Sequence, residues 1–420
     1  MVEMNEQAPK LNIFVSHSSE LLTDCRSHGD GLLAFAFLRR LAERGHTLHV
    51  AVQETEIEGD LPANLKLYPI HTRFRGRITQ RLEYMLKSRL LFNRLRRRHR
   101  FDLIHQLNPV VKGLSLSMLG CGLPVVLGLF YPNWPADADE AEPKLGLAAR
   151  IRLGCRALLR KLALRCQQRQ ASALVLATPK SLDALYKPER VKEKIFLVNQ
   201  GVDAEYFSPG ADRSSGDNNQ HILFVANLWR RKGILTLLEA FEKVAECLPD
   251  SRLTVVGSGG IEEEVHRRAD ALRCRSRITF IKHISRERLP AALRDCTVYC
   301  LPSNGEPLGG SMLEAMACGK PVVATDAGGL GLLVREEGGR KAPPRNAQAL
   351  AEALIEILEA PALQARMGKF NRRLIEEHHA WHRVIEQLES VYRIVLNRKH
   401  DAKNKLTANP SLIAESPRLP

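Results

Sequence analysis

The sequence predicts an α/β protein of two domains, each built on a parallel β-sheet with crossover helices. The chain has 420 residues, whereas a single domain commonly has about 100–200 residues. Short apolar runs alternate with amphipathic helical stretches, and this alternation is typical of parallel sheets. A polar segment at residues 208–220, rich in Gly, Pro, Ser and Asp, interrupts the alternation before it restarts. Two Rossmann-like halves joined by a linker account for all three observations.

The first half opens with a strand at residues 11–15 and a loop of turn formers that ends at His28-Gly29-Asp30-Gly31. A helix with its apolar residues on one face follows, and it stops at Gly45, a common residue at helix ends. Further short buried strands are predicted at residues 46–52, 102–105, 124–127 and 173–177.

The second half repeats this pattern, with a strand at residues 221–226 and an amphipathic helix at residues 234–247. Because ligands bind at the carboxyl ends of parallel strands, we expect both halves to face a shared cleft. The turn Gly257-Ser258-Gly259-Gly260 is a weak dinucleotide signal without a suitably spaced acidic residue, so we reject a dehydrogenase. The remaining strands are predicted at residues 253–256, 278–281, 297–301 and 321–324.

These elements give the expected domain boundaries. They are an N-terminal extension at residues 1–10, a first domain at 11–200, a linker at 201–220, a second domain at 221–380, a helix at 381–398 that packs back on the first domain, and a disordered tail at 399–420.

Composition favours a cytoplasmic protein. No apolar run approaches the roughly 18 residues that span a bilayer, and residues 1–9 lack a signal-peptide pattern. The nine cysteines contain no C-x-x-C pair, so we expect neither a disulfide framework nor a structural metal site. Asp137-Ala138-Asp139 mimics a metal-binding D-x-D motif, but in an acidic loop we interpret it as solvated.

The net charge of +15 is concentrated in two segments. Residues 71–100 hold 11 Lys and Arg and one acid, Glu83, and residues 150–169 hold 7 Lys and Arg and no acid. Either the apolar stripes of these segments pack on the domain and leave the arginines exposed, or the segments dock on anionic lipid. We favour docking, and hence a peripheral position on the inner face of the membrane. Nucleic acid is disfavoured because aromatic residues make up only 5% of the chain. The stripes comprise Ile78, Leu82, Met85 and Leu86, and Ile151, Cys155, Leu158, Leu162 and Cys166.

The segment from Pro302 to Thr325 carries the strongest chemical signal. A strand ends at Pro302, and a glycine-rich loop containing Glu306 leads into a helix that begins near Ser311. The N–H groups and dipole of a helix start bind anions such as a diphosphate. Glu306 and Glu314 could accept hydrogen bonds from different hydroxyl groups of one ligand. Ser311-x-x-Glu314 is also a capping box, which is the structural alternative for Glu314.

This segment resembles the retaining glycosyltransferases of the GT-B fold (glycosyltransferase family 4, group 1 type). The resemblance rests on the Glu-x7-Glu pair, Glu306 and Glu314, with Pro-Leu-Gly after the first Glu, and on Glu-Ala-Met-Ala-Cys-Gly-Lys-Pro-Val-Val-Ala-Thr. Asn199-Gln200-Gly201-Val202-Asp203 and the stretch from Leu223 to Gly233 are similar to the interdomain and diphosphate-binding motifs of that family. The similarity spans roughly residues 11 to 396.

The resemblance implies a role for each matching residue. Glu314 would hold the ribose hydroxyls of the donor, Glu306 would face the donor sugar and reacting centre, and Lys232 would neutralise the leaving diphosphate. Stabilising the leaving group in this way is electrostatic catalysis. It also implies retention of the anomeric configuration, with neither metal nor cofactor. The other implied donor-binding residues are Gly29, Arg231, Leu308, Gly309, Gly310 and Ser311.

Two histidines have predicted contacts outside these motifs. His105, at a strand end, would contact the acceptor or sugar, although a lone His is more often structural. His283 would lie near the nucleobase.

The expected activity is hexosyl transfer from a nucleoside-diphosphate sugar to a saccharide or lipid-linked acceptor, in cell-surface polysaccharide or glycolipid synthesis. The chain departs from the family at Ala226-Asn227-Leu228, where many members have Gly-Arg-Leu, and at Gly128-Leu129-Phe130, where many have a His. These departures keep open a non-catalytic nucleotide-sugar-binding or membrane-scaffold protein. Within the same fold, an epimerase of nucleotide sugars is a minor enzymatic alternative.

Overall fold

The computed structural model describes residues 9–25, 29–74, 76–107, 114–131, 147–210, 220–306 and 308–408. His28, the Asp137-Ala138-Asp139 motif, residues 211–219 of the linker and residues 409–420 lie outside these ranges. The chain divides into two compact units. Unit 1 comprises Met1–Phe130, Lys144–Val198 and Ile385–Pro420, and unit 2 comprises Tyr131–Pro143 and Asn199–Val384.

Unit 1 is built on a seven-stranded sheet in the order β5-β3-β1-β6-β7-β8-β9, and every adjacent pair is parallel. The strands predicted in the first half are confirmed to within a few residues, whereas β5 and β9, at the two edges, were not predicted. Buried aromatic rings of Phe14, Phe92 and Phe101 pack against one another in its core. The strands are β1 (Asn12–His17), β3 (Thr47–Val52), β5 (Leu65–Pro69), β6 (Leu103–Gln106), β7 (Val125–Phe130), β8 (Ala173–Leu176) and β9 (Ile195–Leu197).

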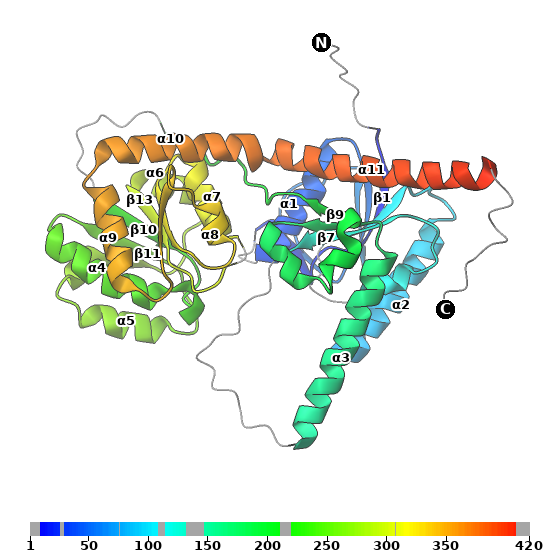
Figure 1. Cartoon of the computed structure of the whole chain (residues 1–420), viewed down its shortest axis with the longest axis horizontal. Coiled ribbons are helices and arrows are strands. Elements are labelled where there is room, and N and C mark those ends of the chain that lie inside the picture. The colour runs from blue at the N-terminus through cyan, green and yellow to red at the C-terminus, as the bar shows by residue number, and fades with distance from the viewer. Residues whose placement is uncertain are drawn as a thin grey trace, which may run out of the picture. The chain divides into compact units, whose positions relative to one another are not determined.

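Three α-helices, three short 3₁₀ helices and a separate pair of parallel strands complete the part of unit 1 that precedes residue 199 within the described ranges (Figure 1). They are α1 (Gly29–Glu43), α2 (Arg77–Leu95), α3 (Leu147–Gln170), η1 (Leu114–Met118), η2 (Pro179–Ala184), η3 (Pro188–Lys194), β2 (Leu21–Thr23) and β4 (Glu54–Glu56).

Unit 2 is built on a six-stranded parallel sheet in the order β12-β11-β10-β13-β14-β15. This order has its switch point between β10 and β13, as in a Rossmann fold, and ligands bind outside the carboxyl ends of the strands at such a point. The strands are β10 (His221–Val225), β11 (Arg252–Val256), β12 (Ile278–Ile281), β13 (Val298–Leu301), β14 (Val322–Thr325) and β15 (Gly339–Ala342).

Helices pack on both faces of this sheet (Figure 1), so the central strands are continuous apolar runs. Ile222, Leu223 and Phe224 of β10 have no exposed surface. The helix predicted at residues 234–247 is confirmed with the same bounds. The helices are α4 (Ile234–Cys247), α5 (Glu262–Asp270), α6 (Leu289–Asp295), α7 (Gly310–Ala317), α8 (Leu330–Leu333), α9 (Ala347–Leu358) and α10 (Pro361–His378), with short 3₁₀ turns η4 (Arg230–Lys232) and η5 (Arg275–Arg277).

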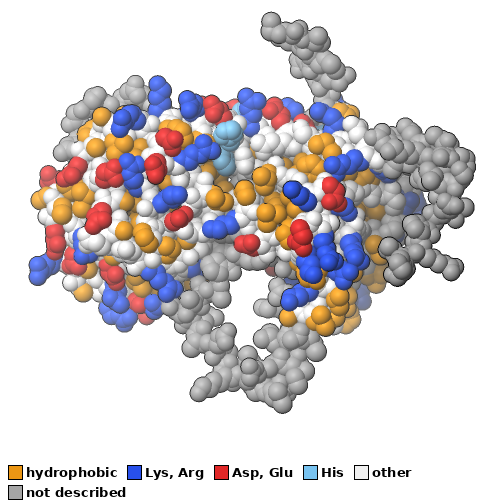
Figure 2. All heavy atoms as spheres, in the orientation of Figure 1, with side chains coloured by type: hydrophobic (Ala, Val, Ile, Leu, Met, Phe, Trp, Pro, Cys, Tyr) orange, Lys and Arg blue, Asp and Glu red, His pale blue; other side chains and the backbone are white. Residues whose placement is uncertain are grey.

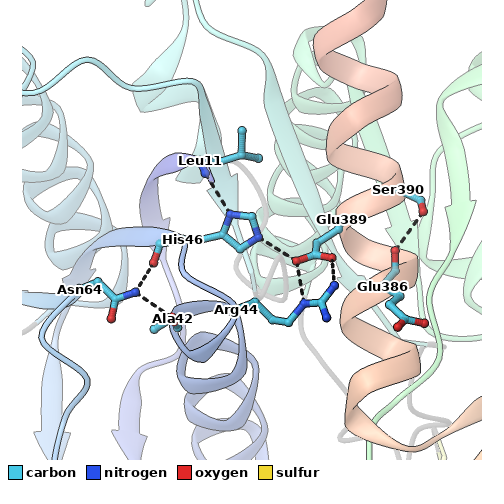
Figure 3. Close-up of polar contacts among 8 residues, drawn as sticks. All are labelled: Leu11, Ala42, Arg44, His46, Asn64, Glu386, Glu389 and Ser390. Atoms are coloured by element: carbon cyan, nitrogen blue, oxygen red, sulfur yellow. Dashed lines mark hydrogen bonds and ion pairs between the residues drawn. The ribbon is translucent and has the colours of Figure 1, made fainter. Parts of the chain in front are cut away.

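The last helix, α11 (Trp381–Ala408), belongs to unit 1 from Ile385 onward. Figure 3 shows how Glu389 attaches it to that unit: one carboxylate oxygen lies 3.0 Å from His46 Nε2, and the other accepts a 2.8 Å hydrogen bond from Arg44 Nη2. Because His46 Nδ1 accepts a hydrogen bond from the Leu11 N–H, we assign the imidazole proton to Nε2, which donates to Glu389.

The prediction of a disordered tail from residue 399 is wrong for the first ten residues of that tail, because α11 continues to Ala408. These ten residues include Ala, Leu and Lys, which favour helix, and they contain neither Gly nor Pro. Within the described ranges, no helix is both long and apolar enough to cross a membrane.

Candidate functional site

The loop that follows β13 places Glu306, and a second loop holds its backbone. The N–H of Gly329 donates a 2.7 Å hydrogen bond to the Glu306 carbonyl oxygen. Gly328 has a φ of +60°, and a Cβ at this position would clash with the backbone of Glu306. The turn after β14 therefore fixes the Glu306 backbone, and it does so only with glycine at position 328.

The loop after β10 brings Lys232 to the same place. Gly233, which directly follows η4, has a φ of +73°, and a Cβ there would clash with the Pro302 carbonyl oxygen. This close approach lets the end of β10 pack on the end of β13. Lys232 Nζ consequently forms an ion pair with Glu306 Oε2, and the two side chains are only 13% and 10% exposed.

Helix α7 begins two residues after Leu308, which is buried. Gly309 is the N-cap residue with a φ of +73°, and a Cβ on it would lie 2.7 Å from Leu330 Cδ2. The N–H groups of the first turn of an α-helix have no acceptor inside the helix. Gly310 adds no side chain over them, so this helix start can receive the oxygens of an anion.

The structural alternative for Ser311 and Glu314, a capping box, is not formed, because α7 begins at Gly310 and its N-cap makes no side-chain hydrogen bond. Ser311 instead lies inside the first turn, where its Oγ is 2.6 Å from the hydroxyl of Tyr299 on β13. The helix starts earlier than the capping box requires because Gly309 adopts the left-handed conformation that turns the chain into it.

Glu314 lies on α7 with its side chain 19% exposed, and its Oε1 is 3.7 Å from Arg286 Nη1. Burial raises the pKa of Glu314 to about 7, against the opposing effect of the Arg286 charge. The guanidinium of Arg286 also lies over the rings of Tyr206 and Phe207, at 5.7 and 5.4 Å from their centroids. An ionised carboxylate offers only hydrogen-bond acceptors, so Glu314 is suited to accept hydrogen bonds from the hydroxyl groups of a ligand.

Arg286 was not predicted from the sequence. It follows β12 at the carboxyl edge of the sheet, and this position is the signal that would have drawn attention to it. The predicted nucleobase residue His283 lies in the same loop and is exposed.

The two arginines of η4 differ in their surroundings. Arg230 is exposed and forms a 2.5 Å ion pair with Glu264, while Arg231 is partly buried beside Lys232. The backbone oxygen of Arg231 accepts hydrogen bonds from Ser303 Oγ and from the Asn304 N–H, which ties η4 to the loop after β13.

Gly29 and His105 belong to unit 1, whereas the other predicted site residues belong to unit 2. Gly29 is the first residue of α1, and a Cβ there would meet no atom within 4 Å. The contact predicted for His105 is not supported, because the side chain is buried and both ring nitrogens are engaged. Nδ1 lies 2.7 Å from the Tyr392 hydroxyl and Nε2 lies 2.8 Å from the Gly128 oxygen. Burial lowers the pKa of His105 to about 4, so the ring is neutral and structural.

Two further features of the described residues lie apart from this cluster. A groove of about 1020 Å³ runs beside β15 and α10, and no predicted site residue lines it. Among the described residues, no three His, Cys, Asp or Glu side chains gather in a group that could hold a metal ion.

Comparison with known sequences places the cluster in a recognised domain. Residues 211–374 match the family model described as "Glycosyl transferases group 1". The phosphatidyl-myo-inositol mannosyltransferase of Mycobacterium leprae is 35% identical over 167 residues, 39% of this chain and 44% of the relative. The glycogen synthase of Mycobacterium tuberculosis is 28% identical over 200 residues, 47% of this chain and 48% of the relative. The chain therefore spans about half the length of the curated relatives it matches.

Solved structures show the same fold across nearly the whole chain. A sucrose-phosphate synthase from Thermosynechococcus elongatus superposes with a TM-score of 0.70 and 20% identity, covering 93% of this chain and 100% of that one. The Anabaena protein HepE, in complex with UDP and glucose, gives a TM-score of 0.64 and 18% identity over 92% and 99% of the two chains. The chain thus has the GT-B fold, and its residues 211–374 match the model of the group 1 glycosyl transferases.

Proposed function

We propose that the protein is a retaining glycosyltransferase of the cytoplasm. It moves a hexosyl group from a nucleoside-diphosphate sugar to a saccharide or lipid-linked acceptor, in the synthesis of a cell-surface polysaccharide or glycolipid. The observation that carries the proposal is the ion pair between Lys232 and Glu306 beside the N-terminus of α7. This arrangement brings together a cation, a carboxylate and a helix start in the loops that follow β10 and β13, the strands at the switch point of the sheet.

Lys232 and the first turn of α7 would bind the donor diphosphate. As the bond between sugar and diphosphate breaks, negative charge grows on the leaving group, and a preorganised cation with N–H groups stabilises it. Without ligand, the Lys232 charge is balanced by Glu306. A bound diphosphate supplies a second anion to the same ammonium group, so Lys232 would bridge the leaving group and the carboxylate that faces the sugar.

Glu314 would hold the ribose, because its partly exposed carboxylate lies on α7, one turn beyond the residues assigned to the phosphates. Leu308, Gly309, Gly310 and Ser311 would line the path between the sugar and the diphosphate. Arg231 would add a second cation from η4, Gly29 would approach the phosphates from unit 1, and His283 would lie near the base. With cations and N–H groups stabilising the leaving group, the reaction would use neither metal nor cofactor.

The names of similar proteins support the acceptor class. The relatives include a phosphatidyl-myo-inositol mannosyltransferase, whose name specifies a lipid acceptor. Structural neighbours include WaaG, described as a glycosyltransferase involved in lipopolysaccharide biosynthesis, and HepE with UDP-glucose. They support a nucleotide-sugar donor and an envelope acceptor for this chain.

Thermal unfolding in the presence of UDP-, GDP- and ADP-sugars tests the proposal. A ligand at 100 times its Kd stabilises the native state by about 2.7 kcal/mol, which raises the midpoint measurably. We expect one nucleotide class to stabilise the wild type and the Glu246→Ala control, whose substitution lies on the exposed side of α4, but not Glu314→Ala. Stabilisation by none of the nucleotides contradicts the proposal. Binding without release of free nucleotide in the presence of acceptors supports the non-catalytic alternative instead.

A further inference from the structure

Helix α2 of unit 1 carries an apolar stripe that faces solvent. Ile78, Leu82, Leu86 and Leu90 recur every four residues, and each is between 57 and 62% exposed. At 1.5 Å per residue, the stripe is about 18 Å long. Contiguous exposed apolar surface of this kind is uncommon on soluble monomers and marks a binding surface.

The opposite side of α2 supplies the core contacts of the helix. Tyr84, Phe92 and Leu95 are buried, and Met85 packs against the same core. The Tyr84 hydroxyl lies 3.0 Å from the backbone oxygen of Ser16, to which it donates a hydrogen bond. Helix α2 is therefore held in unit 1 without its outer stripe, so the alternative in which Ile78, Leu82 and Leu86 pack on the domain is wrong.

Helix α3 extends this surface. Both α2 and α3 contact the same short helix, η1, in unit 1. Leu158, Leu159 and Leu162 of α3 are 46–65% exposed. Figure 2 shows hydrophobic side chains next to Lys and Arg side chains where Figure 1 places these two helices.

The charge of this surface has one sign. Arg94 continues the four-residue spacing of the stripe by one more turn, and Arg97 and Arg98 follow it; all three are exposed. Acidic residues are absent from the sequence of α3. The single acid of α2, Glu83, is neutralised by Lys87 at 2.7 Å and accepts hydrogen bonds from the Arg73 and Phe74 N–H groups. A leucine stripe flanked by uncompensated arginines complements a bilayer surface that carries anionic head groups.

We propose that α2 and α3 form a docking surface for an anionic lipid bilayer, made up of Ile78, Leu82, Leu86, Leu90, Leu158, Leu159 and Leu162 with Arg94, Arg97 and Arg98. The leucines enter the head-group region and the arginines pair with lipid phosphates. The helices lie on the membrane, since neither α2 nor α3 is apolar enough to cross it. The docking surface goes beyond the proposed function, and it adds a place for the reaction, at the lipid surface where a lipid-linked acceptor resides.

Co-sedimentation of the full chain with vesicles tests the surface without any nucleotide, so its outcome is separate from that of the donor assignment. Vesicles of phosphatidylcholine alone are compared with vesicles that also contain phosphatidylglycerol. We expect the wild type to bind the anionic vesicles at least about tenfold more tightly, and raising NaCl from about 0.05 to about 0.5 M to weaken that binding.

Two variants separate the apolar and charged contributions. Leu82→Ser with Leu86→Ser, and Arg94→Glu with Arg97→Glu, should each lower binding to anionic vesicles by at least about tenfold. The matched controls are Leu197→Ser, an exposed leucine of β9 in the same unit, and Arg267→Glu with Arg268→Glu on α5, and both should bind as the wild type does. Thermal unfolding establishes that all variants are folded.

Equal binding to both vesicle types, or unchanged binding by either docking-surface variant, overturns the proposal. A wild type that ignores vesicles but dimerises in sedimentation, with a monomeric Leu82→Ser and Leu86→Ser variant, also overturns it, because the stripe is then covered by a second copy of the chain.

Discussion

Lys232 and Glu306 pair across 74 residues of sequence, and glycines in two different loops make that pairing possible. Gly233 lets the chain after β10 touch the Pro302 carbonyl, and Gly328 lets the turn after β14 touch the Glu306 backbone. The position of the carboxylate therefore depends on backbone contacts more than on the side chains around it.

Replacing Lys232 by Ala should abolish sugar transfer. The leaving diphosphate loses its cation, and Glu306 is left as a mostly buried, unpaired carboxylate that repels the same phosphates. We expect kcat/KM for the donor identified by thermal unfolding to fall by at least about 100-fold, and donor affinity to fall by at least about tenfold. Initial rates of nucleotide release measure the first, and calorimetric titration measures the second.

Lys243→Ala is the control for this change, because Lys243 is an exposed lysine of α4 in the same unit. It should leave both quantities unchanged. Wild-type rates in Lys232→Ala would rule out the role assigned to this lysine.

Gly233→Ala should lower the free energy of unfolding of unit 2 by about 1–3 kcal/mol, because the new methyl group meets the Pro302 oxygen and φ is positive. Gly29→Ala is the matched comparison. At this helix start the methyl group meets no atom within 4 Å, so the stability of unit 1 should stay within about 1 kcal/mol of the wild type. Denaturant unfolding measures both.

A loss of donor affinity in a fully stable Gly29→Ala variant would support the phosphate contact proposed for Gly29. Unchanged affinity would contradict that contact.

Donor affinity should depend on the ionisation of Glu314. A carboxylate accepts hydrogen bonds from both ribose hydroxyls, whereas the protonated acid has lost part of that capacity. With the pKa of Glu314 raised to about 7 by burial, a nucleotide sugar should bind about tenfold more weakly at pH 6 than at pH 8. Calorimetric titration across this range measures the profile.

Arg286→Ala should move the midpoint of that profile to higher pH, because the Arg286 charge favours the ionised form of Glu314. The control Arg288→Ala changes an exposed arginine close in sequence and should leave the midpoint in place. A pH-independent affinity would contradict the contact between Glu314 and the ribose.

The attachment of α11 to unit 1 should weaken in acid. Burial alone would raise the pKa of Glu389, but hydrogen bonds from His46 and Arg44 outweigh it and lower the pKa to about 2. A carboxyl with a depressed pKa in the folded state stabilises the fold above its unfolded pKa, and that contribution is lost as the pH falls through the folded value. We expect a loss of about 2–3 kcal/mol between about pH 4.5 and pH 2.

Acid unfolding of the wild type and of Glu389→Gln measures this contribution. It is the part of the pH dependence of the free energy of unfolding that the wild type shows and the variant lacks. Glu20→Gln, at an exposed position of the same unit, should retain the wild-type dependence. Identical acid profiles for the wild type and Glu389→Gln would show that the carboxylate is not responsible.

The sequence is informative about the site where a motif and a sheet edge coincide. Glu306, Glu314 and Lys232 follow from a strand end, a glycine loop and a helix start, all of which are local patterns. Arg286 does not follow, because its approach to Glu314 depends on the path of a loop after β12. The local sequence also does not distinguish the surroundings of Arg230 and Arg231 in η4, because the difference depends on the ion pair between Arg230 and Glu264.

The same limit applies to the helices of unit 1. The spacing of Ile78, Leu82 and Leu86 predicts a helix with an apolar stripe, yet α2 also has Tyr84, Met85 and Phe92 on its other side. Periodicity identifies an apolar face and does not say which of two apolar faces turns inward. The large aromatic rings decide it here, because they fill the core of unit 1.

Unit 1 is assembled from both ends of the chain, and this division affects how it folds during synthesis on the ribosome. Leu388, Tyr392 and Val395 of α11 are almost fully buried. The Tyr392 hydroxyl also forms a hydrogen bond with the His105 ring. These side chains emerge only after the whole of unit 2 has been translated. Unit 1, whose strands are synthesised first, therefore stays incomplete until the last helix has been made. Unit 2, which is synthesised second, has all of its strands before that helix appears.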